Sequence, residues 1–312
     1  MPFHFELQII PKIDISKTTL AASLVKFANG SVSIYMSKHI YPELFEATFP
    51  EVVSKAGILW GKANNDNQCY CWFPSNLLSD KEIENMISWI EKFRKYQLIG
   101  LNPGIKRYFS NELDYCMALD KRTERNEKPD LLLTLYYTEM GKIVHNIYEN
   151  YSSEEGQVQL NYLIYRLKTA FTDLPIQGIR EEIVLSTTPV SERDKRLSQV
   201  LTERLAQSLS LSMIIPTMTI SKPNLQELTI DEKIRFWNKV YYYDENIRLN
   251  EIVRDKVIIV IDDIYNTGVT LWSYAKYLKE KGAKLVIGLV CVKKLTELDN
   301  NPIEKSRKRS GV

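Results

Sequence analysis

Residues 257–261 are five consecutive β-branched side chains, and Asp262 and Asp263 follow them directly. An unbroken run of this kind is typical of a strand that is buried in the middle of a parallel sheet. A short loop with hydroxyl residues and a glycine comes next, and residues 270–281 then show helical spacing before Gly282, which suits the position after a helix end. Because α/β proteins bind ligands where their parallel strands end, this segment predicts both the sheet type and the place of a site.

The same half of the chain continues to alternate between strands and helices. The other predicted strands are residues 182–185 and 284–292, and the other predicted helices are residues 138–151, 158–171 and 196–211. Strand, helix and strand in this order imply right-handed βαβ units. The charged residues 120–130 have little apolar content, so we interpret them as a loop or junction. We therefore expect an α/β domain over residues 116–298.

Residues 1–115 predict a separate α+β domain of unknown role. Residues 3–9 alternate apolar and polar side chains, as in a half-buried strand, and residues 31–36 predict a second strand. Residues 79–82, Ser-Asp-Lys-Glu, match a capping box in front of apolar residues at helical spacing. At the other end of the chain, residues 299–312 are polar and basic, and we expect a mobile tail there.

The composition excludes several classes of protein. The 312 residues include 41 Lys plus Arg and 39 Asp plus Glu, and the net charge of +2 is unlike the footprint of a general nucleic-acid binder. Four cysteines in a chain of this length indicate reduced thiols and no disulfide framework. The longest apolar runs are far too short to span a bilayer. We therefore expect a cytoplasmic protein that does not bind membranes.

The loop after the two aspartates predicts a phosphate site. Backbone N–H groups and the helix dipole favour an anion at a helix N-terminus, and Gly268 allows close backbone approach or a positive φ. Thr267 and Thr270 can add hydroxyl donors. Paired carboxylates accept hydrogen bonds from sugar hydroxyls, so the segment as a whole suits a sugar phosphate. The alternative is an ordinary strand-to-helix turn with exposed acids.

This segment resembles the phosphoribosyl-pyrophosphate (PRPP) motif of type I phosphoribosyltransferases, in the variant of the ComF-like branch. It reads Asp262-Asp263-Ile264-Tyr265-Asn266-Thr267-Gly268-Val269-Thr270-Leu271. Weaker similarity to that branch extends over residues 138–145, 182–189 and 195–199 and to Gln226, Leu228, Arg235 and Asn238. The resemblance covers about residues 130–298. It implies the parallel sheet flanked by helices of the phosphoribosyltransferase (PRTase) fold, with residues 1–115 as an additional domain.

The resemblance also implies a reaction and a set of site residues. PRPP would bind with Mg²⁺, and an unidentified acceptor would displace pyrophosphate. Asp262 and Asp263 would hold the ribose hydroxyls, stabilise positive charge and help to bind Mg²⁺, which is held largely through the substrate. The 5′-phosphate would be bound by Tyr265, Asn266, Thr267, Gly268, Val269 and Thr270. The pyrophosphate loop would contain Thr187 and Thr188, with Arg196 as an anion partner.

Two residues depart from the family pattern: the first argues against hypoxanthine-guanine salvage, and the second, together with an N-terminal third that has no catalytic constellation, opens an alternative function. Asn266 replaces an aspartate of some purine-salvage members and cannot accept a proton as a carboxylate does. Arg196 replaces the glycine of the Arg-Gly-Phe-Asn-Gln stretch in the ComF-like branch. The alternative is a catalytically inactive protein that senses PRPP or a nucleotide and contacts a protein partner through residues 1–115, in one version a partner in DNA processing. A homodimer is the default expectation for self-association.

Two other features favour ordinary structural roles. Cys69 and Cys71 are closer in sequence than the cysteine pairs of most zinc sites, and no second pair accompanies them. The basic residues of the segment 299–312 are typical of a solvated chain end, and contact with nucleic acid is the weaker alternative.

Overall fold

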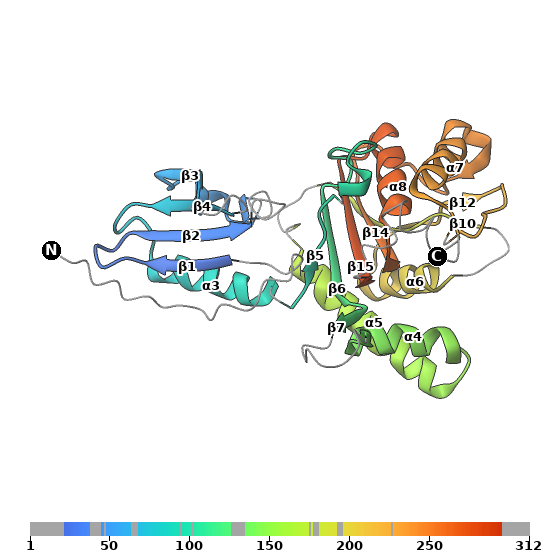
Figure 1. Ribbon diagram of the computed structural model, residues 1–312, viewed down its shortest axis with the longest axis horizontal. Coiled ribbons are helices and arrows are strands. Elements are labelled where there is room, and N and C mark those ends of the chain that lie inside the picture. The colour runs from blue at the N-terminus through green and yellow to red at the C-terminus, as the bar shows by residue number, and fades with distance from the viewer. Residues whose placement is uncertain are drawn as a thin grey trace, which may run out of the picture. The chain divides into compact units, whose positions relative to one another are not determined.

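The computed structural model divides into two compact units, Met1–Gly100 and Leu101–Val312 (Figure 1). It describes residues 22–37, 45–46, 48–63, 68–93, 95–101, 103–125, 135–174, 176, 181–191, 196–225 and 227–294. The strand predicted at residues 3–9 and the tail predicted at residues 299–312 lie outside the described residues. The domain boundary after residue 115 stays a prediction, and residues 101–115 group with the second unit.

The first unit contains an antiparallel sheet and a long amphipathic helix. Its strands lie in the order β1-β2-β4-β3. The elements are β1 (Ala22–Lys26), β2 (Val32–Ser37), α2 (Pro50–Val53), β3 (Ile58–Lys62), β4 (Gln68–Phe73), α3 (Asp80–Phe93) and β5 (Gln97–Leu98). β2 confirms the strand predicted at residues 31–36. α3 buries Ile83, Met86, Trp89, Ile90 and Phe93, which confirms the predicted helical face.

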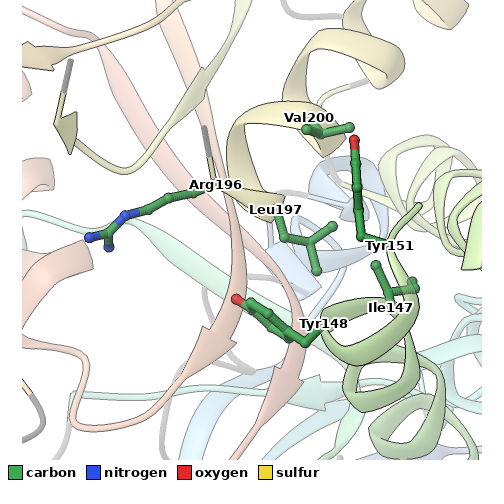
Figure 2. Close-up of a pocket in the computed structure, with 6 residues that line it drawn as sticks. All are labelled: Ile147, Tyr148, Tyr151, Arg196, Leu197 and Val200. Atoms are coloured by element: carbon green, nitrogen blue, oxygen red, sulfur yellow. The ribbon is translucent and has the colours of Figure 1, made fainter. Parts of the chain in front are cut away.

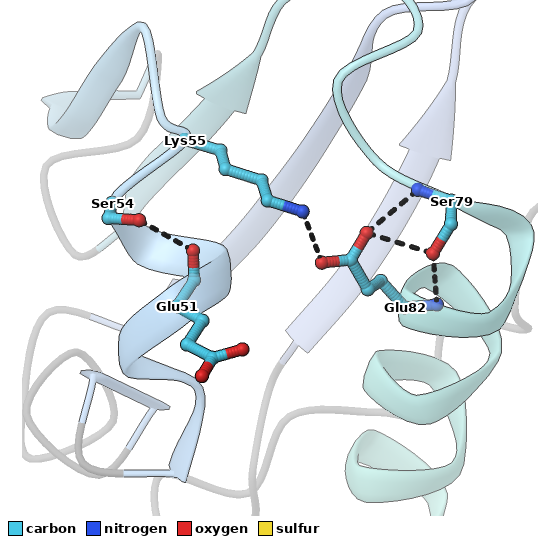
Figure 3. Close-up of polar contacts among 5 residues, drawn as sticks. All are labelled: Glu51, Ser54, Lys55, Ser79 and Glu82. Carbon is cyan, nitrogen blue, oxygen red and sulfur yellow. Dashed lines mark hydrogen bonds and ion pairs between the residues drawn. The ribbon is translucent and has the colours of Figure 1, made fainter.

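The capping box in front of α3 is present (Figure 3). The Glu82 carboxylate accepts hydrogen bonds from the Ser79 backbone N–H at 2.8 Å and from the Ser79 hydroxyl at 2.9 Å. The Glu82 N–H donates to Ser79 Oγ at 3.3 Å, and Lys55 Nζ lies 2.5 Å from the second carboxylate oxygen of Glu82. These donors lower the pKa of Glu82 to about 2, the Lys55 contact contributing most.

We predict that Glu82→Gln lowers the free energy of unfolding by about 0.2–1 kcal/mol at neutral pH, because the amide can keep the capping-box hydrogen bonds but loses the charge that pairs with Lys55. Because the folded protein holds the Glu82 pKa below its ordinary value of 4.5, this contribution is present above pH 4.5 and is lost as the pH falls toward 2. Urea unfolding of both proteins across this range measures the difference. Glu84→Gln, an exposed position on the same helix, is the control, and an equal loss there would contradict the assignment.

The second unit is built on a parallel sheet whose strands follow in the order β11-β9-β14-β15-β6. Their bounds are β6 (Tyr115–Lys121), β9 (Ile183–Thr187), β11 (Met213–Ile214), β14 (Val257–Tyr265) and β15 (Leu285–Lys293). β14 lies between β9 and β15, and its first five residues are fully buried. This confirms the prediction of a central strand in a parallel α/β sheet.

The helices of the second unit form two packed groups. α4 (Glu139–Asn150), α5 (Glu154–Asp173) and α6 (Leu197–Leu209) pack on one another in chain order, and α7 (Ile230–Tyr242) packs on α8 (Val269–Glu280). α4 and α5 contact β15 and β6, α6 contacts β9 and β14, and α8 contacts β15. These helices confirm the ones predicted over 138–151, 158–171, 196–211 and 270–281. In the described residues, no helix is both long and apolar enough to cross a membrane.

The interpretation of residues 120–130 as a loop is wrong for their first part. Asp120 and Lys121 end β6, where they pair with Val292 and Lys293 of β15, and Thr123–Arg125 form β7. Pairing with a strand that is distant in sequence outweighs the polar composition of the segment. Short elements complete the unit: η1 (Pro103–Ile105), β8 (Leu135–Tyr137), β10 (Val190–Ser191), β12 (Thr217–Met218), η2 (Asp244–Asn246) and β13 (Ile247–Arg248).

Candidate functional site

The two aspartates lie in the last part of β14. The strand does not end at Ile261, as predicted, because Ile264 and Tyr265 still pair with Val292 and Lys293 of β15. Strand alternation therefore directs the side chains of Asp262 and Asp263 to opposite faces of the sheet. Both residues are half-buried, at the carboxyl end of the central strand.

Each carboxylate has its own hydrogen-bond partners. The Thr188 hydroxyl donates to Asp262 Oδ1 at 3.2 Å. The Ile264 N–H donates to Asp263 Oδ1 at 2.8 Å, and the Tyr148 hydroxyl donates to Asp263 Oδ2. The acid pair is therefore linked to the loop after β9 and to the end of α4, two segments far apart in sequence.

Burial and nearby cations shift the pKa values of the two aspartates in opposite directions. Burial raises the pKa of Asp262 to about 6, against the opposing effects of Lys222, the Thr188 hydrogen bond and Arg196. Burial also raises the pKa of Asp263, while the Ile264 N–H and the charge of Arg122 oppose this shift. Carboxylates under this combination of burial and nearby charge are typical of functional sites.

Gly268 shapes the loop between β14 and α8. It is the N-cap of α8, and its φ of +82° is the left-handed conformation that favours glycine. A Cβ atom at this position would lie 2.1 Å from the Tyr265 hydroxyl oxygen. The loop therefore passes directly over the Tyr265 ring, and no other residue type fits there without movement.

Some of the predicted phosphate-binding residues are buried, and others lie at the surface of the loop. Tyr265 is buried, and its hydroxyl accepts a hydrogen bond from Trp272 Nε1 at 3.2 Å, so its side chain supports the loop from below. Thr267 and Val269 are also buried, and Thr267 Oγ1 accepts from the Val269 N–H at 3.4 Å. Thr270 is half-exposed. Tyr265 and Val269 could therefore contact a phosphate only through their backbone N–H groups.

The predicted pyrophosphate loop begins beside the acid pair. Thr187, the last residue of β9, is in register with Ile261 of β14, and its buried hydroxyl has no hydrogen-bond partner in the part of the chain that the structure describes. Thr188 contacts Asp262, as stated above. Arg196 is the N-cap of α6 and makes no side-chain capping bond. Lys195 and Gln226, two residues of the weaker resemblance, lie outside the described residues.

Sequence reasoning missed Lys222 near the acid pair. Its Nζ lies 5.0 Å from the centre of the Trp237 ring. Burial and the charge of Arg196 lower the pKa of Lys222 to about 7, and Asp262 opposes this shift. Lys222 lies in an irregular segment after β12, where no periodicity or motif marks a functional residue. Arg122, between β6 and β7, also has no motif around it, whereas Tyr148 lies on the helix predicted over residues 138–151, where helical spacing does not show which distant residue its hydroxyl contacts.

Asp262 and Asp263 are the residues of this site that could help to hold a divalent cation. Among the described residues, no group of three or more His, Cys, Asp or Glu side chains could hold a metal ion. Mg²⁺ usually takes one or two carboxylates and fills its other positions with water and substrate phosphates. Two adjacent aspartates beside a phosphate-binding loop fit that mode of binding.

The surroundings of the four cysteines and of His145 indicate structural roles. All four cysteines are buried, and none of them forms a disulfide bond. Burial, with the charges of Glu46 and Cys69, raises the pKa of Cys71 to about 12, which disfavours the thiolate that a metal would need. The His145 ring stacks on Tyr137, with ring centres 4.9 Å apart, and its Nε2 lies 3.3 Å from Glu149.

We predict that Gly268→Ala destabilises the second unit more than Gly282→Ala does. Both glycines have positive φ, so each substitution costs about 1–2 kcal/mol of backbone strain. A Cβ atom at Gly282 would lie 3.4 Å from the nearest neighbouring atom, which is an ordinary van der Waals contact. A Cβ atom at Gly268 would collide with the Tyr265 side chain. Thermal unfolding of the two variants measures the difference. Equal losses would show that the loop moves off the Tyr265 ring without cost.

A family model describes the segment that contains this site. Residues 171–308 match the model of the phosphoribosyl transferase domain. The match includes β9, α6, β14, α8 and β15, and therefore both aspartates and both loops. α4 and most of α5 precede the matched segment. The chain therefore contains a phosphoribosyltransferase-type domain.

Proteins with related sequences have names that agree with this family. The chain is 26% identical over 148 residues to HGPRTase-like protein 2 of Haloferax volcanii, a match that covers 46% of this chain and 80% of the relative. It is 24% identical over 147 residues to HGPRTase-like protein 1 of Halalkalicoccus jeotgali, with the same two coverages.

Solved structures give weaker matches. A hypoxanthine phosphoribosyltransferase from Staphylococcus aureus shares 16% identity, with a TM-score of 0.30, over 44% of this chain and 64% of that enzyme. A phosphoribosylpyrophosphate synthetase from Mycobacterium smegmatis shares 19% identity, with a TM-score of 0.28, over 45% of this chain and 35% of that protein. The chain thus spans less than two thirds of the length of either structure.

Proposed function

We propose that the second unit binds PRPP with Mg²⁺ and transfers the phosphoribosyl group to an acceptor. The observation that supports this most is the acid pair at the carboxyl end of the central strand. Thr188 of one loop contacts Asp262, and the loop that Gly268 shapes follows Asp263 by five residues. All of these residues lie in the segment that matches the phosphoribosyl transferase domain.

The proposed reaction is a displacement at the anomeric carbon of the ribose. A lone pair of the acceptor forms the new bond to this carbon as the bond to the pyrophosphate oxygen breaks. The bonding electrons leave with pyrophosphate, and a protonated acceptor nitrogen releases its proton to solvent. Asp262 and Asp263 accept hydrogen bonds from the ribose hydroxyls, and their charge stabilises the positive charge that develops on the sugar.

The two loops supply the anion contacts in this proposal. Backbone N–H groups at the start of α8, together with the Thr270 hydroxyl, bind the 5′-phosphate. The buried Thr187 hydroxyl, which has no hydrogen-bond partner among the described residues, would donate to the pyrophosphate, and the side chains of Arg196 and Lys222 would bind its negative charge. Asp262 and Asp263 would help to hold Mg²⁺, and the cation would supply positive charge that offsets the charge of the leaving group. The ComF-like branch, the cytoplasmic location and a partner of residues 1–115 stay predictions.

We predict that Asp262→Asn with Asp263→Asn abolishes Mg²⁺-dependent binding of PRPP. The two amides remove the negative charge but keep the shape of the side chains, so folding is preserved. Calorimetric titration of wild type and the double variant with PRPP, with and without Mg²⁺, measures this. Asp231→Asn, an exposed acid at the start of α7, is the control and should bind as wild type does.

Unchanged PRPP binding in the double variant would contradict the proposed site. Binding by wild type without release of pyrophosphate, whichever acceptor is supplied, would favour the alternative of an inactive sensor. In that case the search moves to the proteins that bind residues 1–115.

We predict that Lys222→Met weakens PRPP binding by about tenfold to a hundredfold, as expected for loss of one charge-assisted hydrogen bond. Lys222→Arg keeps the charge and should retain most of the affinity. The same titration measures both variants. Equal losses for Met and Arg would show that the packing of Lys222 on Trp237 matters and its charge does not.

A further inference from the structure

α5 has apolar side chains on two opposite faces, one buried and one exposed. The buried face consists of the aliphatic residues Leu160, Leu163, Leu167 and Ala170. The opposite face carries Val158, Tyr162 and Tyr165, whose side chains are 63%, 37% and 64% exposed. Their spacing of four and then three residues aligns them along one line of the helix surface. We call these three residues the α5 stripe.

The α5 stripe has the properties of a protein contact surface. The outer face of a helix at a protein surface is normally polar, and contiguous exposed apolar residues mark sites of interaction. Tyrosine is enriched in such interfaces, because its ring packs while its hydroxyl stays hydrated. Most of α5 precedes the segment that matches the family model. The matched domain therefore does not account for the stripe.

The two ends of the stripe carry opposite charges. Glu154 and Glu155 lie at its N-terminal end, and Arg166 and Lys168 lie at its C-terminal end. None of these four side chains forms an ion pair among the described residues. Arg166 donates to the neutral Tyr162 hydroxyl at 3.1 Å, and Lys168 donates to a backbone carbonyl of α6 at 3.1 Å. All four charges are therefore available to a partner.

We propose that the α5 stripe binds a second copy of this chain, with the two α5 helices antiparallel across a two-fold axis near Asn161. In a closed homodimer with such an axis, each residue faces the residue at the mirrored position of the second copy. Val158 then lies opposite Tyr165 of the second copy, so the apolar parts meet. The acidic end of each helix lies opposite the basic end of the other, which gives the charge complementarity that directs association.

The charges also match on each flank of the stripe. Because an α-helix turns by about 100° per residue, Glu154 and Lys168 share one flank, and Glu155 and Arg166 share the other. A two-fold axis perpendicular to both helices brings the same flank of each copy to the same edge of the interface. Glu154 therefore meets Lys168 of the second copy, and Glu155 meets Arg166. A parallel pair of helices would instead bring like charges together.

The interface is small, so we expect a reversible dimer. Stable protein–protein interfaces usually bury about 1,200–2,000 Å² in total, and one pair of helices of this length lies at or below the lower end of that range. The mass should therefore rise with protein concentration. The inference does not depend on the proposed function, because no residue of the stripe contacts Asp262 or Asp263 in the part of the chain that the structure describes.

Sedimentation velocity of the full chain, from micromolar to millimolar concentration, measures the association. We expect Tyr165→Ser to weaken it by about tenfold or more, the usual effect of truncating a central aromatic residue of an interface. Tyr242→Ser, a tyrosine that is 79% exposed at the end of α7, is the matched control and should associate as wild type does. Circular dichroism and thermal unfolding check that each variant folds.

Exchange of charges tests the antiparallel arrangement. Glu154→Lys and Lys168→Glu should each weaken association by about tenfold, since each places like charges opposite one another twice in the symmetric dimer. An equimolar mixture of the two variants should associate as wild type does, because every lysine of one then faces a glutamate of the other. Glu155→Lys and Arg166→Glu repeat this test on the other flank, in case Lys168→Glu does not fold.

Three results would overturn the inference. The first is wild type that stays monomeric over the whole concentration range, in which case the stripe serves another partner. The second is a Tyr165→Ser variant that associates as strongly as wild type. The third is a mixture of charge-exchanged variants that associates no better than either variant alone. PRPP binding enters none of these measurements, so the inference and the proposed function stand or fall separately.

Discussion

The pairing of β14 with β9 on one side and β15 on the other holds the candidate site together. The strand is buried through Ile261 and still pairs with β15 at Tyr265, so the backbone that bears the two aspartates is fixed by the sheet. Parallel pairing also brings the carboxyl end of β9 to the same edge, which is why Thr188 reaches Asp262. Loss of the pairing with β9 would separate Asp262 from the loop that contains Thr188.

The second constraint is electrostatic. The sheet buries two carboxylates, and burial alone favours their neutral forms. Arg196, Lys222 and Arg122 offset part of this cost, although they lie on three different segments of the chain. Burial and the repulsion of Arg196 lower the pKa of Lys222 to about 7 and so favour its neutral form. The positive charges of the site therefore balance the two carboxylates only in part. A ligand that combines anionic phosphates with donor hydroxyls would satisfy both kinds of group.

A cavity of about 480 Å³ lies between the end of α4 and the start of α6 (Figure 2). α6 lies inside the segment that matches the phosphoribosyl transferase domain, and α4 lies before it.

The sequence by itself determined the elements whose signals are local. The β-branched run, the Ser79 and Glu82 capping box, and the periodic helices are set by burial and by hydrogen bonds between near neighbours. The aspartates and the loop at Gly268 also lie beside each other because they are adjacent in the sequence.

Only the tertiary structure decided which distant residues meet there. Lys222 and Arg122 have no motif around them, and the helical spacing around Tyr148 does not encode its contact with Asp263. β6 forms because β15 offers a partner strand. Tyr265 turned out to support the loop from below, since burial and the Trp272 hydrogen bond fix its side chain. Contacts of this kind depend on packing between remote segments, and residue type and spacing do not encode them.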